Sequence, residues 1–417
     1  MKNIDASIVT IGDELLIGQV IDTNSAWMAQ QLNRIGVSVK RRVAVGDDAG
    51  EIRKVLTSEN ISADIVLITG GLGPTSDDIT KEILCEYFSG KMIIDKGALD
   101  NVNYLFQQVY HKPISDIILK QAEVPDVCEV VQNKRGSAPG MIFQKEGTIF
   151  ISMPGVPYEM QGIMQDVIPY LEKKFSLPAI IHKTILTAGI GESSLAEIIK
   201  DFEKQLPKEI RLAYLPNYGM VRLRLTTSGF DKDKTEKLIN DQFEQLKKLV
   251  HTYIVTDEDE SMQKVVGEIL LKNKKTISTA ESCTGGTIAR LITSVPGSSA
   301  YYEGSIVSYS YDIKESLLNV KKETLDKYGA VSEETVKEML SGLLEKMKTD
   351  YGIAVSGIMG PEGGTPGKPV GTVFVAVGTK EKQVVQKLKQ RFERAKNIEV
   401  TSVMALNIMR KFLLNED

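Results

Sequence analysis

Near its N-terminus the chain twice repeats the same order: a short apolar segment, a glycine-bearing loop and a helix-like stretch. The apolar segments are ASIVTI (6–11) and DIVLIT (64–69), and the helix patterns cover about 24–35 and 77–88. Strands and helices that alternate in this way favour a parallel sheet covered by helices. Two later strand patterns lie at 128–133 and 147–151, and a helix pattern follows at 157–173. We therefore predict an α/β domain over residues 1–177.

The middle of the chain, residues 178–256, follows a different order and predicts a small α+β module. Strand and helix patterns alternate as β-α-β-β-α-β: 183–189, 192–205, 210–216, 219–227, 232–250 and 252–256. This order resembles the KH fold. KH modules that bind RNA carry a GXXG loop with basic neighbours, whereas the nearest candidate here, GIGE (189–192), ends in an acidic residue. We expect a structural or dimer-forming module and no nucleic-acid partner.

Residues 257–417 predict a third domain, which is again α/β. The acidic stretch TDEDES (256–261) separates it from the middle module. Its helix patterns lie at 262–272, 284–294, 332–347 and 394–414. Its strand patterns lie at 276–280, 304–309, 351–356, 370–378 and 383–391. The segment GIMGPEGGTPGKP (357–369) is too rich in glycine and proline for regular structure and predicts a loop.

The charge balance and the cysteines indicate a cytoplasmic protein with small-molecule partners. Lys and Arg number 51 against 55 Asp and Glu, a net charge of -4, which gives no basic footprint for nucleic acid. No apolar run approaches the ~20 residues that a membrane helix needs. The start, MKNIDASIVTIG, enters a strand at once and lacks the layout of a secretory signal. The three cysteines are widely spaced and make neither a disulfide framework nor a zinc site.

The segment TISTAESCTGGTIARL (276–291) contains a candidate nucleophile, Ser282, in a region without histidine. The three histidines are His111, His182 and His251, so the last 166 residues contain none. A serine between a strand and a helix can be a nucleophile with amide donors beside it, or a helix cap before a phosphate-holding loop. As a nucleophile it would need a base other than histidine.

Lysine, tyrosine and the carboxylates are the remaining bases, and GSIVSYSYDIK (304–314) offers Tyr309 and Lys314. For Lys314 to be neutral near pH 7, its pKa must fall from ~10.4 by about three units, which costs ~4 kcal/mol of differential solvation. The alternative is an ordinary solvated lysine. Cys283 is the rival nucleophile, but without histidine its thiolate would depend on a helix N-terminus or a lysine, and we favour Ser282.

Two loops of the first domain predict a second site, which would bind phosphate and a metal ion. GDELLIGQVIDTN (12–24) and GGLGPTSDDIT (70–80) each follow an apolar strand, and loops at the carboxyl ends of parallel strands converge on one crevice. Glycine amides and a helix start after Ser76 favour phosphate. Carboxylates beside a phosphate need a divalent cation between them. The alternative is that these residues only form turns and helix caps.

These stretches resemble the first domain of the CinA family (competence/damage-inducible protein A). The resemblance is carried by TIGDELLIGQVIDTNS, TGGLGPTSDDITKE, GSAPGM and MPGVPYEM. It implies a molybdopterin-binding-like, three-layer α/β domain that hydrolyses ADP-ribose with Mg²⁺, Mn²⁺ or Co²⁺. The metal-ligand candidates are Glu14 and Asp78, with Asp13 and Asp77 next. The phosphate-binding candidates are Gly70, Gly71, Gly73, Thr75, Asp22 and Asn24.

The third segment resembles the C-terminal domain of the same family, which is shared with nicotinamide-nucleotide amidases. The carrying motifs are AESCTGG, GSIVSYSYDIK, GAVSEETV, SGIMGPEGGTPGKPVGTV and RFERAKNI. The resemblance implies that Ser282 is the nucleophile, Lys314 the base and Tyr309 its helper, without a cofactor. The implied substrate-binding residues are Thr284, Gly285, Gly286, Ser356, Gly357 and Arg394, the last meeting the substrate phosphate. The chain departs from the family at Tyr311, where asparagine is common.

Together these features predict a bifunctional enzyme of pyridine-nucleotide salvage. Its C-terminal domain would convert nicotinamide mononucleotide and water to nicotinate mononucleotide and ammonia. Its N-terminal domain would cleave ADP-ribose to AMP and ribose 5-phosphate. The alternatives are that only one domain is active, or that the chain is a non-catalytic molybdopterin-binding or competence-associated scaffold. The resemblance also implies a homodimer.

Overall fold

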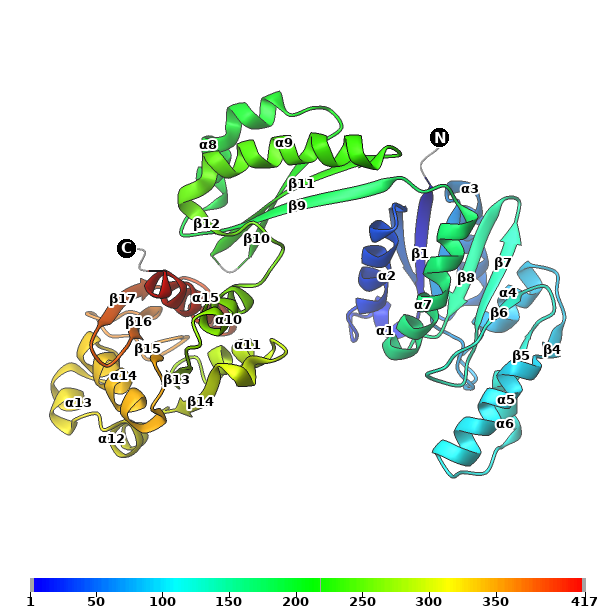
Figure 1. Cartoon of the computed structure of the whole chain (residues 1–417). Helices are drawn as coiled ribbons and strands as arrows, with labels where there is room; N and C mark the ends of the chain where they lie inside the picture. Colours follow the sequence, from blue (N-terminus) through cyan, green and yellow to red (C-terminus); the bar gives the residue numbers. More distant parts are fainter. Residues whose placement is uncertain (1–3, 218, 415–417) are drawn as a thin grey trace. The chain divides into compact units, whose positions relative to one another are not determined.

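A computed structural model of the chain describes residues 4–217 and 219–414 and has the predicted mixed α/β fold. Figure 1 shows its elements in sequence order. The chain divides into two compact units, Met1–Ile181 with Thr227–Lys237 and His182–Thr226 with Leu238–Asp417. Most of the middle module therefore belongs to the same unit as the C-terminal domain. Within the described residues, no helix has both the length and the apolar character that a bilayer crossing requires.

A six-stranded sheet forms the centre of the N-terminal domain, in the order β2-β1-β3-β8-β7-β6. β2, β1, β3 and β8 are parallel, while β7 is antiparallel to both of its neighbours, β8 and β6. The strands are β1 (Asp5–Ile11), β2 (Ser38–Val45), β3 (Ile65–Thr69), β6 (Glu129–Val131), β7 (Gly140–Lys145) and β8 (Thr148–Met153). A separate pair consists of β4 (Met92–Ile94) and β5 (Glu123–Pro125).

Helices cover both faces of this sheet, because alternate residues of each strand point to opposite sides (Figure 1). Ala6 and Ile8 of β1 belong to the core beneath α2 and α7. Val9 and Ile11 belong to the core beneath α3 and α4. The helices are α1 (Asp13–Leu16), α2 (Thr23–Arg34), α3 (Ala49–Ser62), α4 (Thr80–Tyr87), α5 (Lys96–Tyr104), α6 (Asp116–Leu119) and α7 (Pro157–Lys174), with η1 (Leu105–Val109) and η2 (Lys120–Ala122) between α5 and β5.

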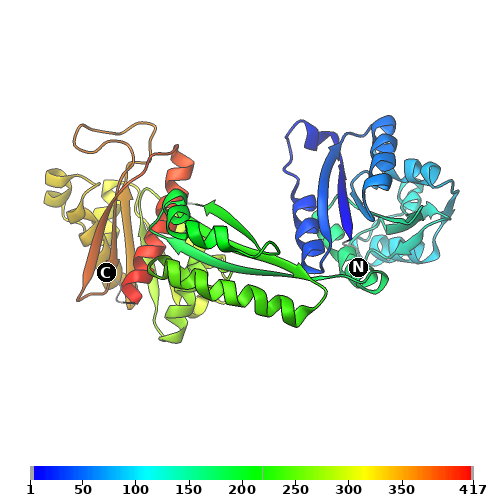
Figure 2. The ribbon, with the colours of Figure 1, turned by 90° about the horizontal axis from the view of Figure 1, so that it is seen from above.

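The middle module has the predicted β-α-β-β-α-β order and a four-stranded sheet, β10-β11-β9-β12. Its elements are β9 (Ala179–Ala188), α8 (Glu192–Gln205), β10 (Arg211–Asn217), β11 (Met220–Gly229), α9 (Lys232–Val250), η3 (His251–Tyr253) and β12 (Ile254–Thr256). Both α8 and α9 lie on one face of the sheet (Figures 1 and 2). Leu186, Met220 and Val255 join the apolar core of the C-terminal domain, so the module is packed against that domain.

The C-terminal domain has a five-stranded sheet in the order β14-β13-β15-β16-β17. β13 lies between β14 and β15 and is parallel to both, while β16 is antiparallel to both of its neighbours, β15 and β17. One core lies beneath α10, α11 and α15, and the other beneath α12, α13 and α14. The strands are β13 (Ile277–Glu281), β14 (Tyr302–Val307), β15 (Tyr351–Gly357), β16 (Thr372–Gly378) and β17 (Gln383–Lys389). The helices are α10 (Met262–Lys272), α11 (Thr287–Thr293), η4 (Ser298–Ala300), α12 (Tyr311–Leu318), α13 (Lys322–Tyr328), α14 (Glu333–Met347) and α15 (Arg394–Leu413).

Candidate functional site

The carboxyl ends of the three parallel strands of the C-terminal sheet meet at one cavity of about 160 Å³. Ser282 directly follows β13, Tyr309 lies two residues beyond β14, and Ser356 is the second-to-last residue of β15. Loops at this edge of a parallel sheet converge, which is where α/β proteins bind ligands. Six predicted site residues line the cavity: Ser282, Tyr309, Lys314, Ser356, Gly357 and Arg394.

Ser282 and Lys314 form a buried pair although they are 32 residues apart in sequence. The Nζ of Lys314 lies 3.0 Å from the Oγ of Ser282. It also donates to the backbone carbonyls of Ser308, at 2.6 Å, and Tyr309, at 3.3 Å. A neutral amine has two N–H groups and one lone pair, so the two carbonyls can accept both hydrogens while the lone pair faces the serine hydroxyl. The geometry fits a general base beside a nucleophile.

Burial controls the protonation of this pair. Lys314 is only 1% exposed, and burial lowers the pKa of its amine from 10.5 to about 8. The thiol of Cys283, also in the cavity lining, is buried as well, and burial raises its pKa to about 12. A thiol with so high a pKa is a poor nucleophile near neutral pH because the thiolate is the reactive form. The structure therefore favours Ser282 over Cys283.

Glu281, which sequence reasoning missed, organises the loop that carries Ser282. Its side chain is fully buried and accepts hydrogen bonds from the amides of Gly286 (3.0 Å), Ile288 (3.0 Å) and Ala289 (2.8 Å). These are the free amides at the start of α11. Gly285 and Gly286 have positive φ values of 59° and 93°, which lets the chain turn back over the carboxylate.

The loop after the nucleophile therefore has a different role from the one we predicted. Thr284, Gly285 and Gly286 do not line the cavity. The Gly286 amide is already bonded to Glu281, so it is not free to hold a substrate phosphate. The glycines serve the turn that leads from β13 into α11. Only a carboxylate followed by glycines could have suggested this cap from the sequence.

The remaining wall residues are held by hydrogen bonds of their own. Ser356 donates to the carbonyl of Ala330 at 2.6 Å, and the amide of Ala330 donates to the hydroxyl of Tyr311 at 3.2 Å. Tyr311, at which we expected a departure from the family motif, thus bonds to the backbone of Ala330, which lines the cavity. Arg394 donates to the hydroxyl of Tyr309 at 2.8 Å and to the carbonyl of Gly360 at 2.9 Å.

The predicted N-terminal site also lies at the carboxyl ends of parallel strands, around two adjoining cavities. A cavity of about 400 Å³ is lined by six predicted residues, the set Glu14, Gly70, Gly71, Gly73, Asp77 and Asp78. A smaller one of about 110 Å³ shares Glu14 and Gly70 with it and adds Asp22 and Asn24. Asp13 and Thr75 line neither cavity.

Several predicted phosphate ligands are already engaged within the protein. The amide and hydroxyl of Thr75 both donate to the carboxylate of Asp78, the amide at 3.0 Å. Asp22 caps α2 by accepting from the amide of Ser25 at 2.9 Å. Asn24 donates to the carbonyl of Gly155 at 2.7 Å. Thr75 and Asp22 therefore hold the loops in shape, which was the alternative interpretation of these motifs.

The helix that we expected directly after Ser76 begins later. α4 starts at Thr80, whose amide donates to the carbonyl of Gly71 at 3.2 Å. Residues 75–78 form a turn instead, in which the amide of Asp78 donates to the carbonyl of Thr75 at 3.1 Å, and the glycine loop 70–73 lies against this segment. The glycine amides therefore do not lie at the first turn of a helix, and the expected helix-dipole contribution is weaker than predicted.

Asp47 adds a carboxylate to this site that sequence reasoning missed. It follows β2, lines the larger cavity and accepts from the amide of Asp13 at 3.1 Å, while the Asp47 amide donates to Asp13 at 3.2 Å. Burial, and then the negative charges of Asp13, Glu14 and Asp77, raise the pKa of Asp47. Carboxylates crowded enough to repel one another suit a divalent cation.

The described residues contain no group of three or more His, Cys, Asp or Glu side chains placed to hold a metal ion. The donor set nevertheless fits Mg²⁺ or a similar cation, since these ions often take one or two carboxylates together with substrate phosphates and water. One or two of the cavity-lining carboxylates, which are Glu14, Asp47, Asp77 and Asp78, would be the protein ligands.

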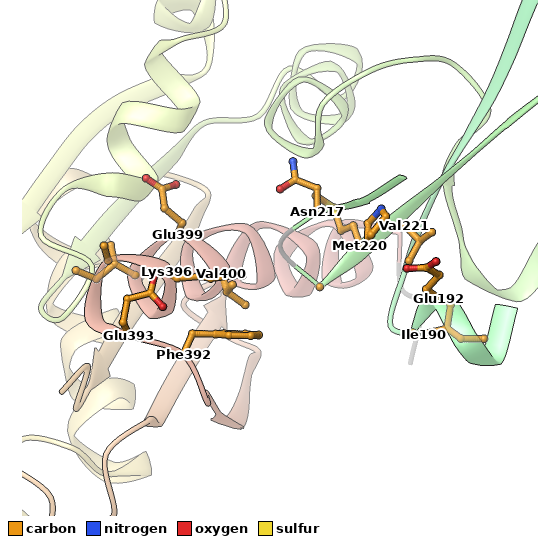
Figure 3. Close-up of a pocket in the computed structure, with 15 residues that line it drawn as sticks. Ile190, Glu192, Asn217, Met220, Val221, Phe392, Glu393, Lys396, Glu399 and Val400 are labelled. Atoms are coloured by element: carbon orange, nitrogen blue, oxygen red, sulfur yellow. The ribbon is translucent and has the colours of Figure 1, made fainter. Parts of the chain in front are cut away.

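A larger cavity, of about 840 Å³, lies between the middle module and the start of α15 (Figure 3). Its lining includes Met220 and Val221 of β11, Phe392, and the charged Glu393 and Lys396. The first turn of α15 therefore borders two cavities, since Arg394 lines the smaller one. Size alone does not identify the site, because the nucleophile and base lie in the smaller cavity.

Comparison with known proteins covers the whole chain. Three family models match: the probable molybdopterin binding domain at residues 7–173, the damage-inducible protein CinA KH domain at 182–256 and the CinA C-terminal domain at 259–413. A CinA-like protein of Flavobacterium psychrophilum is 46% identical over 98% of both chains. One of Cytophaga hutchinsonii is 44% identical over 99% of this chain and 98% of its own. The chain belongs to the CinA family.

Proposed function

We propose that the C-terminal domain is an amidase that hydrolyses nicotinamide mononucleotide to nicotinate mononucleotide and ammonia. The observation that carries this proposal is the buried Ser282–Lys314 pair, with 3.0 Å between Oγ and Nζ. Membership of the CinA family suggests an enzyme, and the strand-end cavity supplies a place for the substrate amide.

The reaction follows from the chemistry of the pair. Lys314 takes the proton of Ser282 as the serine oxygen attacks the carboxamide carbon and forms a C–O bond. The C–N bond then breaks, and ammonia leaves with the proton returned by Lys314. Water, activated by the same amine, hydrolyses the acyl-serine ester, which releases the nicotinate product and restores Ser282.

The decisive experiment compares two adjacent substitutions. Ser282→Ala removes the nucleophile, so ammonia release from nicotinamide mononucleotide should fall to background. Cys283→Ala should keep most of the activity, because the thiol is protonated near neutral pH. Ammonia and nicotinate mononucleotide are measured together. Loss of activity in Cys283→Ala with retention in Ser282→Ala would assign the nucleophile to the thiol instead.

We propose as a second activity that the N-terminal domain hydrolyses the pyrophosphate of ADP-ribose to give AMP and ribose 5-phosphate. The supporting observation is the cavity that places Glu14, Asp47, Asp77 and Asp78 next to the glycine loop 70–73. A bound divalent cation would neutralise the pyrophosphate charge and polarise the bond to be broken. The glycine loop would allow the phosphates to approach the backbone closely.

The N-terminal activity is tested by mixing the protein with ADP-ribose and Mg²⁺, Mn²⁺ or Co²⁺ and measuring AMP. Asp78→Asn should lower the rate by on the order of a hundredfold, because it removes a charge that faces the phosphates. Asp100→Asn, the same change at an exposed position of α5 outside the cavity, is the matched control. Full activity of Asp78→Asn, or activity without any metal, would contradict this assignment.

A further inference from the structure

The guanidinium of Arg394 is bonded to the protein in a way that the predicted phosphate contact does not require. Its Nη2 donates to the Tyr309 hydroxyl at 2.8 Å, and its Nη1 donates to the carbonyl of Gly360 at 2.9 Å. An arginine reserved for a phosphate would present this planar fork to the ligand. Here two donors of the fork are directed at a side chain and a peptide of the cavity wall.

Arg394 is held by a rigid support. Asn397, one turn further along α15, is fully buried. Its Nδ2 donates to the carbonyls of Met359 (3.0 Å) and Phe392 (2.7 Å), and its Oδ1 accepts from the amide of Phe392 at 3.0 Å. These bonds tie the first turn of α15 to the loop that contains Gly360. The backbone from which Arg394 extends is therefore fixed by the fold, and the two hydrogen bonds of its Nη atoms hold the exposed side chain.

The Tyr309 side chain, in contrast, is exposed and is not held in place by packing. It is 63% exposed, although it belongs to the lining of the same cavity as Ser282 and Lys314. An exposed aromatic side chain loses rotamer freedom when it is held in one place. The hydrogen bond from Arg394 supplies that restraint. The carbonyl of Tyr309 also accepts from Lys314 at 3.3 Å, so one residue contacts both the base and the arginine.

We propose that Arg394 is a positioning residue that holds the Tyr309 hydroxyl beside the Ser282–Lys314 pair. The inference rests on the proposed amidase function. Because the Tyr309 oxygen accepts from the guanidinium, its own O–H is left to donate into the cavity. That donor can bond to the amide nitrogen as it leaves. Arg394 then acts on the reaction through Tyr309, and the substrate phosphate is not its main partner.

Kinetics with and without the substrate phosphate separate the two roles. Arg394→Ala should lower kcat on the order of a hundredfold. The loss should be the same for nicotinamide mononucleotide and for nicotinamide riboside, which has no phosphate. Tyr309→Phe should lose a similar factor, and the double variant should be no slower than Tyr309→Phe alone. Added guanidinium ions should restore part of the rate of Arg394→Ala, but none in the double variant.

Other outcomes overturn the inference. A higher KM for the mononucleotide with unchanged kinetics on the riboside would make Arg394 a phosphate ligand. Additive losses in the double variant would show that Arg394 and Tyr309 act separately. Arg391→Ala, which removes the same charge three residues earlier and outside the cavity, is the matched control and should retain the wild-type rate.

A crystal structure of Arg394→Ala tests the positioning without turnover. The Tyr309 ring should leave its place or lose its order, while Ser282 and Lys314 stay in contact. A Tyr309 hydroxyl that keeps its position would refute the inference even if the protein is an amidase. Absence of turnover in the wild type would instead contradict the proposed function, and the crystal structure would still decide the role of Arg394.

Discussion

The contacts of Lys314 show how this fold produces a base without histidine. Its almost fully buried amine reaches two backbone carbonyls and one hydroxyl inside the protein. A charged ammonium in the same place would lose its hydration, and this loss of solvation is what lowers its pKa. At pH 7 about a tenth of the molecules therefore carry a neutral Lys314 amine, and near pH 8 about half of them do.

This environment predicts the pH dependence of the amidase. Lys314 acts as a base only when it is neutral, and its pKa is lowered from 10.5 to about 8. Below that pH, kcat/KM should rise about tenfold per pH unit, and above it the rate should level off. Lys314→Arg, which stays charged, should be inactive throughout. A rate for nicotinamide mononucleotide that is independent of pH between about 6 and 9 would argue against a lysine base.

A single site residue could be predicted from the sequence where the chemistry allowed few residue types. The lack of histidine in the last third of the chain directed attention to Lys314, and the family motifs paired it with Ser282. Asp47 and Glu281 were not found, because an acidic residue after a strand is common and only the folded contacts distinguish these two. The bond between Tyr311 and Ala330 joins residues that no local pattern connects.

Among the elements, those with a clear apolar pattern were predicted and those on the surface were not. The buried strands β1, β3 and β13 and the helices α8, α9 and α15 lie within a few residues of their expected bounds. β2 was missed because its sequence, SVKRRVAV, has three charged residues in a row. It is an edge strand with largely exposed side chains, so no alternation marks it. α3 and α13 also had no predicted counterpart.

The link between β13 and α11 gives a prediction at the level of elements. Glu281→Gln leaves a single acceptor oxygen opposite three amides, and its NH₂ group faces donors. It should destabilise the C-terminal unit by about 2 kcal/mol, because bonds to a charged group are lost. In urea, the circular dichroism transition should move to lower concentration.

The only tryptophan provides an internal control for this measurement. Trp27 lies on α2 and packs against the core of the N-terminal domain, so its fluorescence reports on the other unit. The Trp27 transition should stay where it is in Glu281→Gln. An unchanged circular dichroism curve would mean that the carboxylate contributes nothing to the helix start.

On the scale of the whole molecule, the two units share one arrangement of sheet, covering helices and candidate site. Each unit has helices on both faces of a largely parallel sheet, and each has its candidate site at the carboxyl ends of the strands. Because the two sites lie in separate compact units, Ser282→Ala should leave ADP-ribose hydrolysis intact and Asp78→Asn should leave the amidase intact. The expected homodimer stays a prediction.

In each unit the apolar core is separate from the loops at the carboxyl ends of the strands, and this separation bears on how such a protein can evolve. Most of the apolar side chains that hold each sheet to its helices belong to the strands and helices, whereas Ser282, Tyr309 and Asp78 lie in loops that follow strands. Mutations in these loops can therefore abolish or change one reaction while the domain stays folded. A descendant with one silent half would look like an intact protein, and only an assay of each half would reveal the loss.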